Sequence, residues 1–352
     1  MSHINVTFAL SNLSRPAEPA SELHLEPAMK VAVTDFSFPS LELEEAILKP
    51  AGASLLSGQC KTPETLIPLV ADADAVITQF APLRREVIQA MTRAKVIVRY
   101  GIGVDNVDLE AARECGIPVC NVPDYCIDEV ADHTLAFILA TTRQVVPNCL
   151  HVRDGKWGLA TPLDSLKALN HVTVGLIGFG RIGREVADRL KAFKCRVLVH
   201  DPVTPPADIE AAGCIPTDRT ALLTESDIVS LHCPSTPQTR GMINRVTLEH
   251  MKPGVVLINL ARGDLVDSDA LTAALQQGKV AAAALDVFAP EPIPADHPIL
   301  KLPNVIVASH IASVSVPAVR KLRETAAKLA LAALRGEDLP NIVNGVTPGR
   351  KS

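Results

Sequence analysis

The sequence predicts an α/β protein made of two doubly wound parallel sheets. From Met29 onward, short runs of Val, Ile and Leu alternate with helical segments, which is the pattern of parallel strands connected by helices. Of the 352 residues, 47% are apolar and only 3% are aromatic, a balance that suits helices packed against buried strands. A chain of this length can form two domains with separate cores.

Composition also excludes several classes of protein. The formal net charge is −5, so nothing suggests a surface for nucleic acid or for an anionic membrane. No apolar run is long enough to span a bilayer. The 8 cysteines include no C-x-x-C pair and accompany no His-rich spacing. We therefore expect reduced thiols, a cytoplasmic protein and no metal site.

Residues 1–28 differ from the rest of the chain. They are polar and contain Pro16, Pro19 and Pro27. They lack the basic start and the long apolar core of a secretory signal. We therefore expect a polar and mobile N-terminal extension, with the fold beginning at Met29.

In the first half of the chain, β-branched runs alternate with helical runs. The expected strands are 30–34, 75–78, 96–99 and 117–122, and the expected helices are 41–48, 84–92 and 107–114. The third of these strands leads into a glycine-rich turn, Tyr100-Gly101-Ile102-Gly103. This turn lacks a third glycine.

The second half begins with a long apolar helix, expected at 130–141 because acidic residues just before it favour a helix N-terminus. The stretch through Pro162 is less regular and holds the only tryptophan, Trp157. We expect Trp157 to be packed rather than to cap a ligand site, since tryptophan is mostly well buried. Further strands are expected from 172 and at 197–200, 227–232, 255–260, 281–287 and 305–308, followed by a helix at 317–335.

The most informative motif is the glycine turn that follows the strand beginning at Val172. Gly178, Gly180 and Gly183 have the spacing G-x-G-x-x-G, a helical run follows, and Asp201 closes the next strand. The first glycine allows a tight turn, the second lets the backbone approach a pyrophosphate, and the third lets helix and strand pack closely. The helix start offers unpaired N–H groups to the phosphates. This order of elements predicts a dinucleotide-binding unit of the Rossmann type.

The charge next to this turn indicates which dinucleotide binds. Asp201 can accept a hydrogen bond from a ribose 2′-hydroxyl but would repel a 2′-phosphate. The residues that follow, 202–206, include no Arg or Lys to offset that repulsion. We therefore predict NAD in preference to NADP.

Four polar residues follow the later strands: Arg262, Asp286, Glu291 and His310. Each alone has an ordinary interpretation, such as a surface charge or a loop histidine. Ligands of open α/β sheets bind at the carboxyl ends of the strands, so these side chains can converge there. Arginine can hold a carboxylate with two hydrogen bonds, and a histidine beside a carboxylate can transfer a proton near neutral pH. Hydride transfer to a 2-oxo acid requires both functions.

The motifs together resemble the NAD-dependent D-2-hydroxyacid dehydrogenase family. The similarity extends from about Met29 to Asn344. The Val-Pro-Asp-Tyr-Cys version at 122–126 is similar to the branch that includes phosphoglycerate dehydrogenase-like enzymes and the corepressor C-terminal binding protein. The matching blocks are 178–183 with Asp201, 231–244, 258–263, 284–292, 309–312, 99–108 and 121–133.

The resemblance implies a domain organisation. A Rossmann-type NAD domain (123–310) would be inserted in a flavodoxin-like substrate domain (29–122 and 311–352), with a hinged cleft between them. It also implies a homodimer, in which the apolar helix from Val130 and the segment after it could bury the partner.

The resemblance further implies roles for individual residues. His310 would be the general acid/base, Glu291 would pair with it and keep the imidazolium available, and Arg262 would bind the substrate carboxylate. The amides of Gly101, Ile102 and Gly103 would form a second carboxylate cradle. Tyr100 and Tyr125 lie in loops that would face the rest of the substrate.

A larger set would contact the cofactor, with Asp286 at the nicotinamide carboxamide and Arg181 and Ile182 over the pyrophosphate. The full set is Gly178, Gly180, Arg181, Ile182, Gly183, Asp201, His232, Cys233, Pro234, Thr239, Leu260, Ala261, Arg262, Asp286, His310 and Ala312.

Two functions remain open. The first is a D-2-hydroxyacid dehydrogenase or 2-oxoacid reductase acting on a small acid whose identity the sequence leaves open. The second is an NAD(H)-responsive binding scaffold of the C-terminal binding protein type. A pure scaffold could lose Arg262, Glu291 and His310, so their presence favours catalysis.

Overall fold

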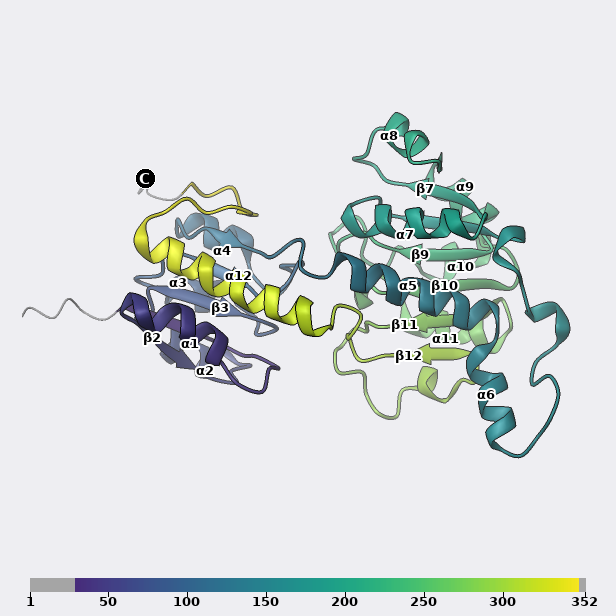
Figure 1. Ribbon diagram of the computed structural model, residues 1–352, viewed down its shortest axis with the longest axis horizontal. Coiled ribbons are helices and arrows are strands. Elements are labelled where there is room, and N and C mark those ends of the chain that lie inside the picture. The colour runs from purple at the N-terminus through teal and green to yellow at the C-terminus, as the bar shows by residue number, and fades with distance from the viewer. Residues whose placement is uncertain (1–28, 348–352) are drawn as a thin grey trace, which may run out of the picture.

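The computed structural model describes residues 29–347 and forms two α/β units, each built on one parallel sheet (Figure 1). This confirms the predicted fold class. The expected extension at 1–28 lies outside the described residues. None of the helices within 29–347 has the length and apolarity needed to cross a bilayer.

The first unit has a five-stranded sheet of order β2-β1-β3-β4-β5, in which all neighbouring pairs are parallel. This is the flavodoxin-like order. The strands are β1 (Met29–Val33), β2 (Ala53–Ser57), β3 (Ala75–Thr78), β4 (Ile97–Arg99) and β5 (Val119–Cys120). The helices of this unit are α1 (Glu42–Leu48), α2 (Pro63–Val70), α3 (Arg85–Gln89), α4 (Leu109–Glu114) and α12 (Val316–Arg335), with a 3-10 turn η1 (Lys49–Ala51).

The second unit has a seven-stranded parallel sheet of order β12-β11-β10-β9-β6-β7-β8. Six of these strands follow the Rossmann order, and β12 adds one more at the edge. The strands are β6 (Thr173–Ile177), β7 (Arg196–His200), β8 (Ile215–Pro216), β9 (Ile228–Leu231), β10 (Val255–Asn259), β11 (Val280–Leu285) and β12 (Val305–Val307).

Seven helices of the second unit surround or flank this sheet: α5 (Ile127–Thr142), α6 (Val145–Arg153), α7 (Arg181–Ala192), α8 (Pro206–Ala211), α9 (Arg219–Glu225), α10 (Arg245–His250) and α11 (Ser268–Gln276). Four 3-10 turns, η2 (Leu163–Ser165), η3 (Leu169–His171), η4 (Gly263–Leu265) and η5 (Pro298–Lys301), complete it.

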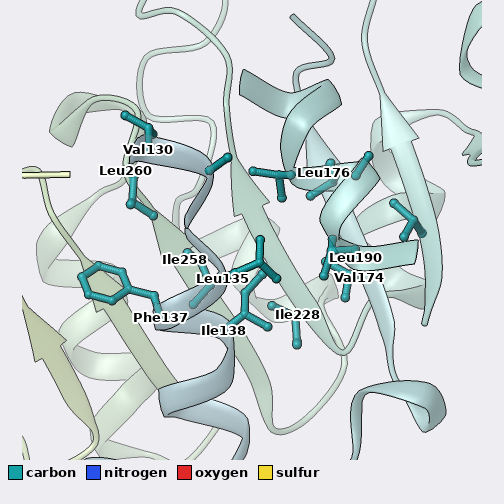
Figure 2. Packing of buried hydrophobic residues seen from close by; sticks show 14 of the residues in the cluster. Val130, Leu135, Phe137, Ile138, Val174, Leu176, Leu190, Ile228, Ile258 and Leu260 are labelled. Carbon is teal, nitrogen blue, oxygen red and sulfur yellow. The ribbon is translucent and has the colours of Figure 1, made fainter. Parts of the chain in front are cut away.

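Two helices show where the chain passes between the units. Helix α5 directly follows β5 in sequence, yet it packs on β10, β11 and α7 of the second unit. Figure 2 shows Leu135 and Ile138 of α5 against Ile228 and Ile258 of the second sheet. Helix α12 returns to the first unit and packs on α1, β3 and β4 (Figure 1). The proposed domain limits at 122/123 and 310/311 fall in the connections before these two helices.

A buried ion pair anchors α12 to the first unit. Arg323 donates to both carboxylate oxygens of Glu44, at 2.8 and 2.6 Å, and Glu44 is fully buried. The Tyr100 hydroxyl donates to the same carboxylate at 2.9 Å. The hydrogen bonds that Arg323 donates to Glu44 raise the pKa of this guanidinium group. The pair therefore joins α1, α12 and the end of β4.

The sequence analysis did not anticipate β2 or α2. Strand β2 lies at the edge of the sheet and most of its residues are not buried, so it lacks the continuous apolar run of a central strand. Helix α2 contains Pro63 and Pro68. Proline normally ends a helix, but the first stands at the N-terminus, where its missing N–H costs nothing.

The expectation of a less regular stretch after 141 was wrong. Helix α6 occupies Val145–Arg153, and none of its residues is buried. Without a buried face there is no apolar periodicity in the sequence to indicate a helix. Trp157 was also expected to be packed, but its exposed fraction in the monomer is 91%.

The buried pair yields a stability prediction. Replacing Arg323→Met leaves the Glu44 carboxylate buried without its cation, so we expect the free energy of unfolding to fall by about 3–5 kcal/mol. Denaturant unfolding measures this change. Arg320→Met, at an exposed position one turn away on α12, is the control and should change stability by less than about 0.5 kcal/mol. Equal effects of the two substitutions would contradict this account of the pair.

Candidate active site

The carboxyl ends of strands from both sheets meet in one cleft. A cavity of about 790 Å³ is lined by residues that follow β1 and β3 in the first unit and by residues that follow β11 and β12 in the second. Phe80, after β3, lies with its ring 5.8 Å from the ring of His310, after β12. The cleft therefore brings together side chains that lie far apart in the sequence.

His310 and Glu291 form a hydrogen-bonded pair in this cleft. The His310 Nδ1 lies 2.8 Å from Glu291 Oε2, and Glu291 Oε1 accepts the Phe288 N–H at 2.9 Å. Burial raises the pKa of the Glu291 carboxyl, but the contacts with His310 and Phe288 outweigh it and lower this pKa overall. Because Nδ1 is engaged, Nε2 is the ring nitrogen left for proton transfer.

Asp286 fixes the turn that presents His310. Its carbonyl accepts the His310 N–H at 2.7 Å, and its carboxylate accepts the N–H groups of Ile311 and Ala312 at 2.8 and 2.9 Å. His310 has a φ of 58°, a left-handed conformation that costs free energy in a non-glycine residue. The Asp286 contacts offset that cost. Only 1% of Asp286 is exposed. Its contact with nicotinamide therefore stays a prediction.

Arg262 reaches from the second unit to the glycine turn of the first. Its Nε donates to Asp105 Oδ1 at 2.8 Å, and a Cβ on Gly103 would overlap its guanidinium group. Burial raises the pKa of Asp105, but the charge of Arg262 outweighs it and lowers this pKa overall. Its Nη1 donates to the Ala261 carbonyl at 2.8 Å, so Nη2, which has no hydrogen-bond partner among the described residues, is the nitrogen left for an anion.

Arg99 is a second cation at this place, and the sequence analysis missed it as a site residue. It is the last residue of β4, its buried Nε has no hydrogen-bond partner among the described residues, and a Cβ on Gly101 would overlap its guanidinium group. Burial, followed by the charge of Arg262, lowers the pKa of Arg99 to about 10. Arg99 therefore stays protonated at neutral pH. Its positive charge and that of Arg262 both lie against the glycine turn at 101–103. Such a pair favours binding of an anion.

The glycine turn itself differs from the prediction in two respects. The Gly101 N–H already donates to the Arg99 carbonyl at 2.9 Å, so of the three predicted amides it is not free for a ligand. The Tyr100 side chain is 1% exposed and lies in the core of the first unit, so the prediction that it faces the substrate was wrong. Tyr125 packs against the cores of both units.

The geometry of the second glycine turn fits a dinucleotide. Gly178 has a φ of 103°, and a Cβ there would lie 2.6 Å from the His232 backbone. A Cβ on Gly183 would overlap the Gly178 carbonyl, whereas Gly180 has open space on that side. Helix α7 begins at Arg181 without a side-chain cap, so its first N–H groups point to the space beside Gly180.

Asp201 lies beside this turn with its carboxylate held by the backbone. It accepts the N–H groups of Phe179, Val203 and Thr204 at 2.6, 2.8 and 2.9 Å. Burial raises the pKa of this carboxyl, but the three backbone hydrogen bonds outweigh it and lower the pKa overall. A fixed negative charge therefore lies where the ribose of a bound dinucleotide is expected.

Other residues that were predicted to contact the cofactor are buried or form hydrogen bonds within the protein. Burial lowers the pKa of His232 to about 4, so the ring is neutral, and it hydrogen-bonds Ser230 Oγ at 2.9 Å. Burial raises the pKa of the Cys233 thiol to about 11. The Thr239 hydroxyl donates to the Pro234 carbonyl at 2.7 Å. Leu260 and Ala312 are buried in the core beneath the cleft, and Ala261 is half-buried.

Comparison with known proteins gives a consistent result. Residues 135–312 match the family model described as D-isomer specific 2-hydroxyacid dehydrogenase, NAD binding domain. A glyoxylate reductase of Korarchaeum cryptofilum is 39% identical over 284 residues, which cover 80% of this chain and 86% of that protein. A D-3-phosphoglycerate dehydrogenase of Archaeoglobus fulgidus is also 39% identical and covers 80% of this chain, but the match covers only 52% of that protein.

The fold is shared with a solved enzyme. D-Lactate dehydrogenase from Aquifex aeolicus, in a complex with NAD and lactic acid, has a TM-score of 0.81 and 32% sequence identity to this chain. The match covers 92% of this chain and 100% of that one.

The two arginines generate a binding prediction. Sodium oxalate should raise the Tm of the protein by a few degrees relative to sodium chloride at equal ionic strength, because ligand binding to the folded state stabilises it. Arg99→Met and Arg262→Met should each remove the rise, whereas Arg219→Met, at an exposed position on α9, should keep it. A rise that persists in both site variants would show that oxalate binds elsewhere.

Proposed function

The chain belongs to the D-isomer specific 2-hydroxyacid dehydrogenase family, and from this premise we propose that its cleft interconverts 2-oxo and D-2-hydroxy acids with NAD(H). Members of this family are NAD-dependent oxidoreductases that act on 2-hydroxy acids. The observation that carries the proposal is the His310–Glu291 pair close to two cations, because the Phe80 ring lies beside both His310 and Arg99 and the charge of Arg262 acts on Glu291. The His310–Glu291 pair supplies a proton donor, and the two arginines supply a carboxylate anchor.

The proposed substrate position follows from these groups. Arg262 and Arg99 bind the carboxylate, together with the amides of Ile102 and Gly103. This orientation brings the C2 carbonyl oxygen to Nε2 of His310. Asp105 holds Arg262 through its Nε, so the guanidinium group is oriented before the substrate arrives and less entropy is lost on binding.

The acid/base step is assigned to His310. In reduction, the protonated ring gives its Nε2 proton to the carbonyl oxygen, and in oxidation the neutral ring removes the proton of the 2-hydroxyl group. Glu291 accepts a hydrogen bond from Nδ1 and fixes the orientation of the ring. NADH, when bound at the glycine turn of Gly178–Gly183, supplies the hydride.

We also propose that NAD is preferred over NADP. Asp201 carries a negative charge held by three backbone N–H groups, and it would accept a hydrogen bond from the 2′-hydroxyl of the adenosine ribose. A 2′-phosphate would lie against that charge. The remaining cofactor contacts proposed from the sequence lie around the same turn and the strand ends beside it.

The assembled catalytic groups support an enzyme over the NAD(H)-responsive scaffold. A scaffold has no use for His310 and Glu291 at hydrogen-bond distance or for Arg262 held toward an anion site. Such strained and charged geometry would cost stability for no gain if it served no reaction.

A homodimer is proposed on the basis of an exposed apolar surface. It is formed by α6 and the segment after it, and its most exposed members are Val145, Leu150, Val152, Trp157, Leu159 and Leu163. Monomers seldom expose so many apolar side chains in one stretch, and such surfaces mark interaction sites. The second copy of this chain is the partner that the proposal names.

The acid/base assignment is tested by substitution. His310→Gln should lower kcat for glyoxylate, pyruvate or hydroxypyruvate reduction by about 10²–10⁴-fold while the Kd for NADH stays unchanged. Glu291→Gln should lower kcat by a smaller factor, because the ring loses the carboxylate that fixes its orientation through Nδ1. Steady-state kinetics across pH and NADH fluorescence titration measure both effects. Near-normal turnover by His310→Gln would remove this residue from the mechanism.

The cofactor preference is tested with both nicotinamide cofactors. The wild type should use NADH at least about tenfold better than NADPH by kcat/KM, and Asp201→Asn should reduce that ratio because the repulsion of the 2′-phosphate is removed. Asp208→Asn changes an exposed acid on the neighbouring helix α8 and serves as the matched control. Equal use of the two cofactors by the wild type would contradict the role given to Asp201.

The dimer is tested by its mass in solution. Light scattering after size exclusion should give twice the 37.5 kDa of the chain, and Leu150→Glu should give monomer. Trp157 is the only tryptophan, so its fluorescence should shift to longer wavelength when Leu150→Glu exposes it. A wild-type mass equal to one chain would refute the dimer.

A further inference from the structure

The cavity in the cleft is lined by residues other than those of the anion site. His310 and Glu291 line it, but Arg99, Arg262 and the glycine turns do not. A substrate whose carboxylate is held by the arginines and whose carbonyl meets His310 has one remaining substituent, the group on C2. This cavity, of about 790 Å³, is the space beside His310 into which that group can extend.

The wall nearest the reacting atoms is aromatic. The centroid of the Phe80 ring lies 5.8 Å from that of the His310 ring, and the Arg99 Cζ lies 5.7 Å from the same Phe80 centroid. Half of Phe80 is exposed, at 50%. Phe80 therefore lies at the boundary between the anion site and the cavity, where it would contact the first atoms of a C2 substituent.

The opposite wall is also apolar. Phe288, Ile293, Leu300 and Val307 line it, and Val307 keeps 45% of its surface exposed. Apolar side chains left uncovered on both sides of a concave site are a typical feature of pockets that take apolar ligand groups.

Most polar residues of the cavity form hydrogen bonds with other residues of its walls. The Asp35 carboxylate accepts the N–H groups of Gln79 and Phe80 at 2.9 and 2.7 Å. The Gln79 amide bonds Ser37 at 2.7 and 3.0 Å, and Gln59 donates to the Phe36 carbonyl at 2.8 Å. These contacts leave the apolar surfaces to determine which group fits, and Lys61 is an exposed cation among the lining residues.

We propose that this cavity selects 2-oxo acids with a bulky apolar group on C2, such as an aromatic or branched aliphatic side chain. The inference rests on the proposed function, since it needs the carboxylate at Arg99 and Arg262. Glyoxylate carries only hydrogen on C2 and would leave both apolar walls uncovered. A phenyl or isobutyl group would cover them and remove apolar surface from water.

The test compares kcat/KM for phenylpyruvate and 2-oxoisocaproate with that for glyoxylate and pyruvate, using the full chain and NADH. The bulky acids should be preferred by about tenfold or more, the range that differential burial in an apolar pocket gives. Phe80→Ala should lower the ratio of phenylpyruvate to glyoxylate by a similar factor, and Phe80→Leu should restore part of it. Phe193→Ala removes the same atoms at a partly exposed position outside the cavity and should keep the ratio.

Two failures can be told apart. Turnover of no 2-oxo acid at all would overturn the proposed function itself. Turnover in which glyoxylate or pyruvate is preferred would leave that function standing and overturn the bulky-group inference. Preference for 2-oxoglutarate that Lys61→Met abolishes would also overturn it, because a distal carboxylate would then be the recognised group. If Phe80→Ala lowered kcat/KM equally for all acids, Phe80 would position the substrate and would have no role in selecting it.

Discussion

Two guanidinium groups, one from each unit, lie against the glycine turn at 101–103. The organisation of the cleft depends on how the structure accommodates the repulsion between them. Arg99 ends β4 and Arg262 follows β10. Glycine at positions 101 and 103 leaves room for both groups, because a Cβ at either place would overlap a guanidinium group. Asp105 neutralises part of the charge by pairing with Arg262. The remaining positive charge favours a carboxylate, so the proposed substrate would link the two units.

The other side of the cleft depends on carboxylates that accept backbone N–H groups. Asp35 holds the loop of Phe80, Asp201 holds the turn beside Gly178, and Asp286 holds the turn of His310. Each aspartate follows a parallel strand, where the chain leaves the sheet and its N–H groups lose their ladder partners. Satisfying these groups inside the protein fixes the loops without filling the space between them. His310, the proposed acid/base, can therefore keep a left-handed backbone conformation.

Local patterns in the sequence were sufficient for the two sheets except their edge strands β2 and β8, for the glycine turn at Gly178 and for the strand-end positions of Arg262, Glu291 and His310. They were not sufficient for Arg99 and Tyr100, whose directions depend on the alternation of side chains along β4. Neighbouring residues of a strand point to opposite faces, so Arg99 reaches the cleft while Tyr100 enters the core. Helix α6 gave no signal because no face of it is buried within one chain. Trp157 was misjudged for the same reason, since its environment in the monomer is solvent.

The most direct test of this account is a crystal structure of the protein with NADH and oxamate, an unreactive analogue of a 2-oxo acid. The account predicts that the oxamate carboxylate binds Arg262 and Arg99 at the Ile102–Gly103 amides, with its carbonyl oxygen at hydrogen-bond distance from Nε2 of His310. Oxamate bound away from both arginines, or with its carbonyl oxygen out of reach of His310, would contradict it.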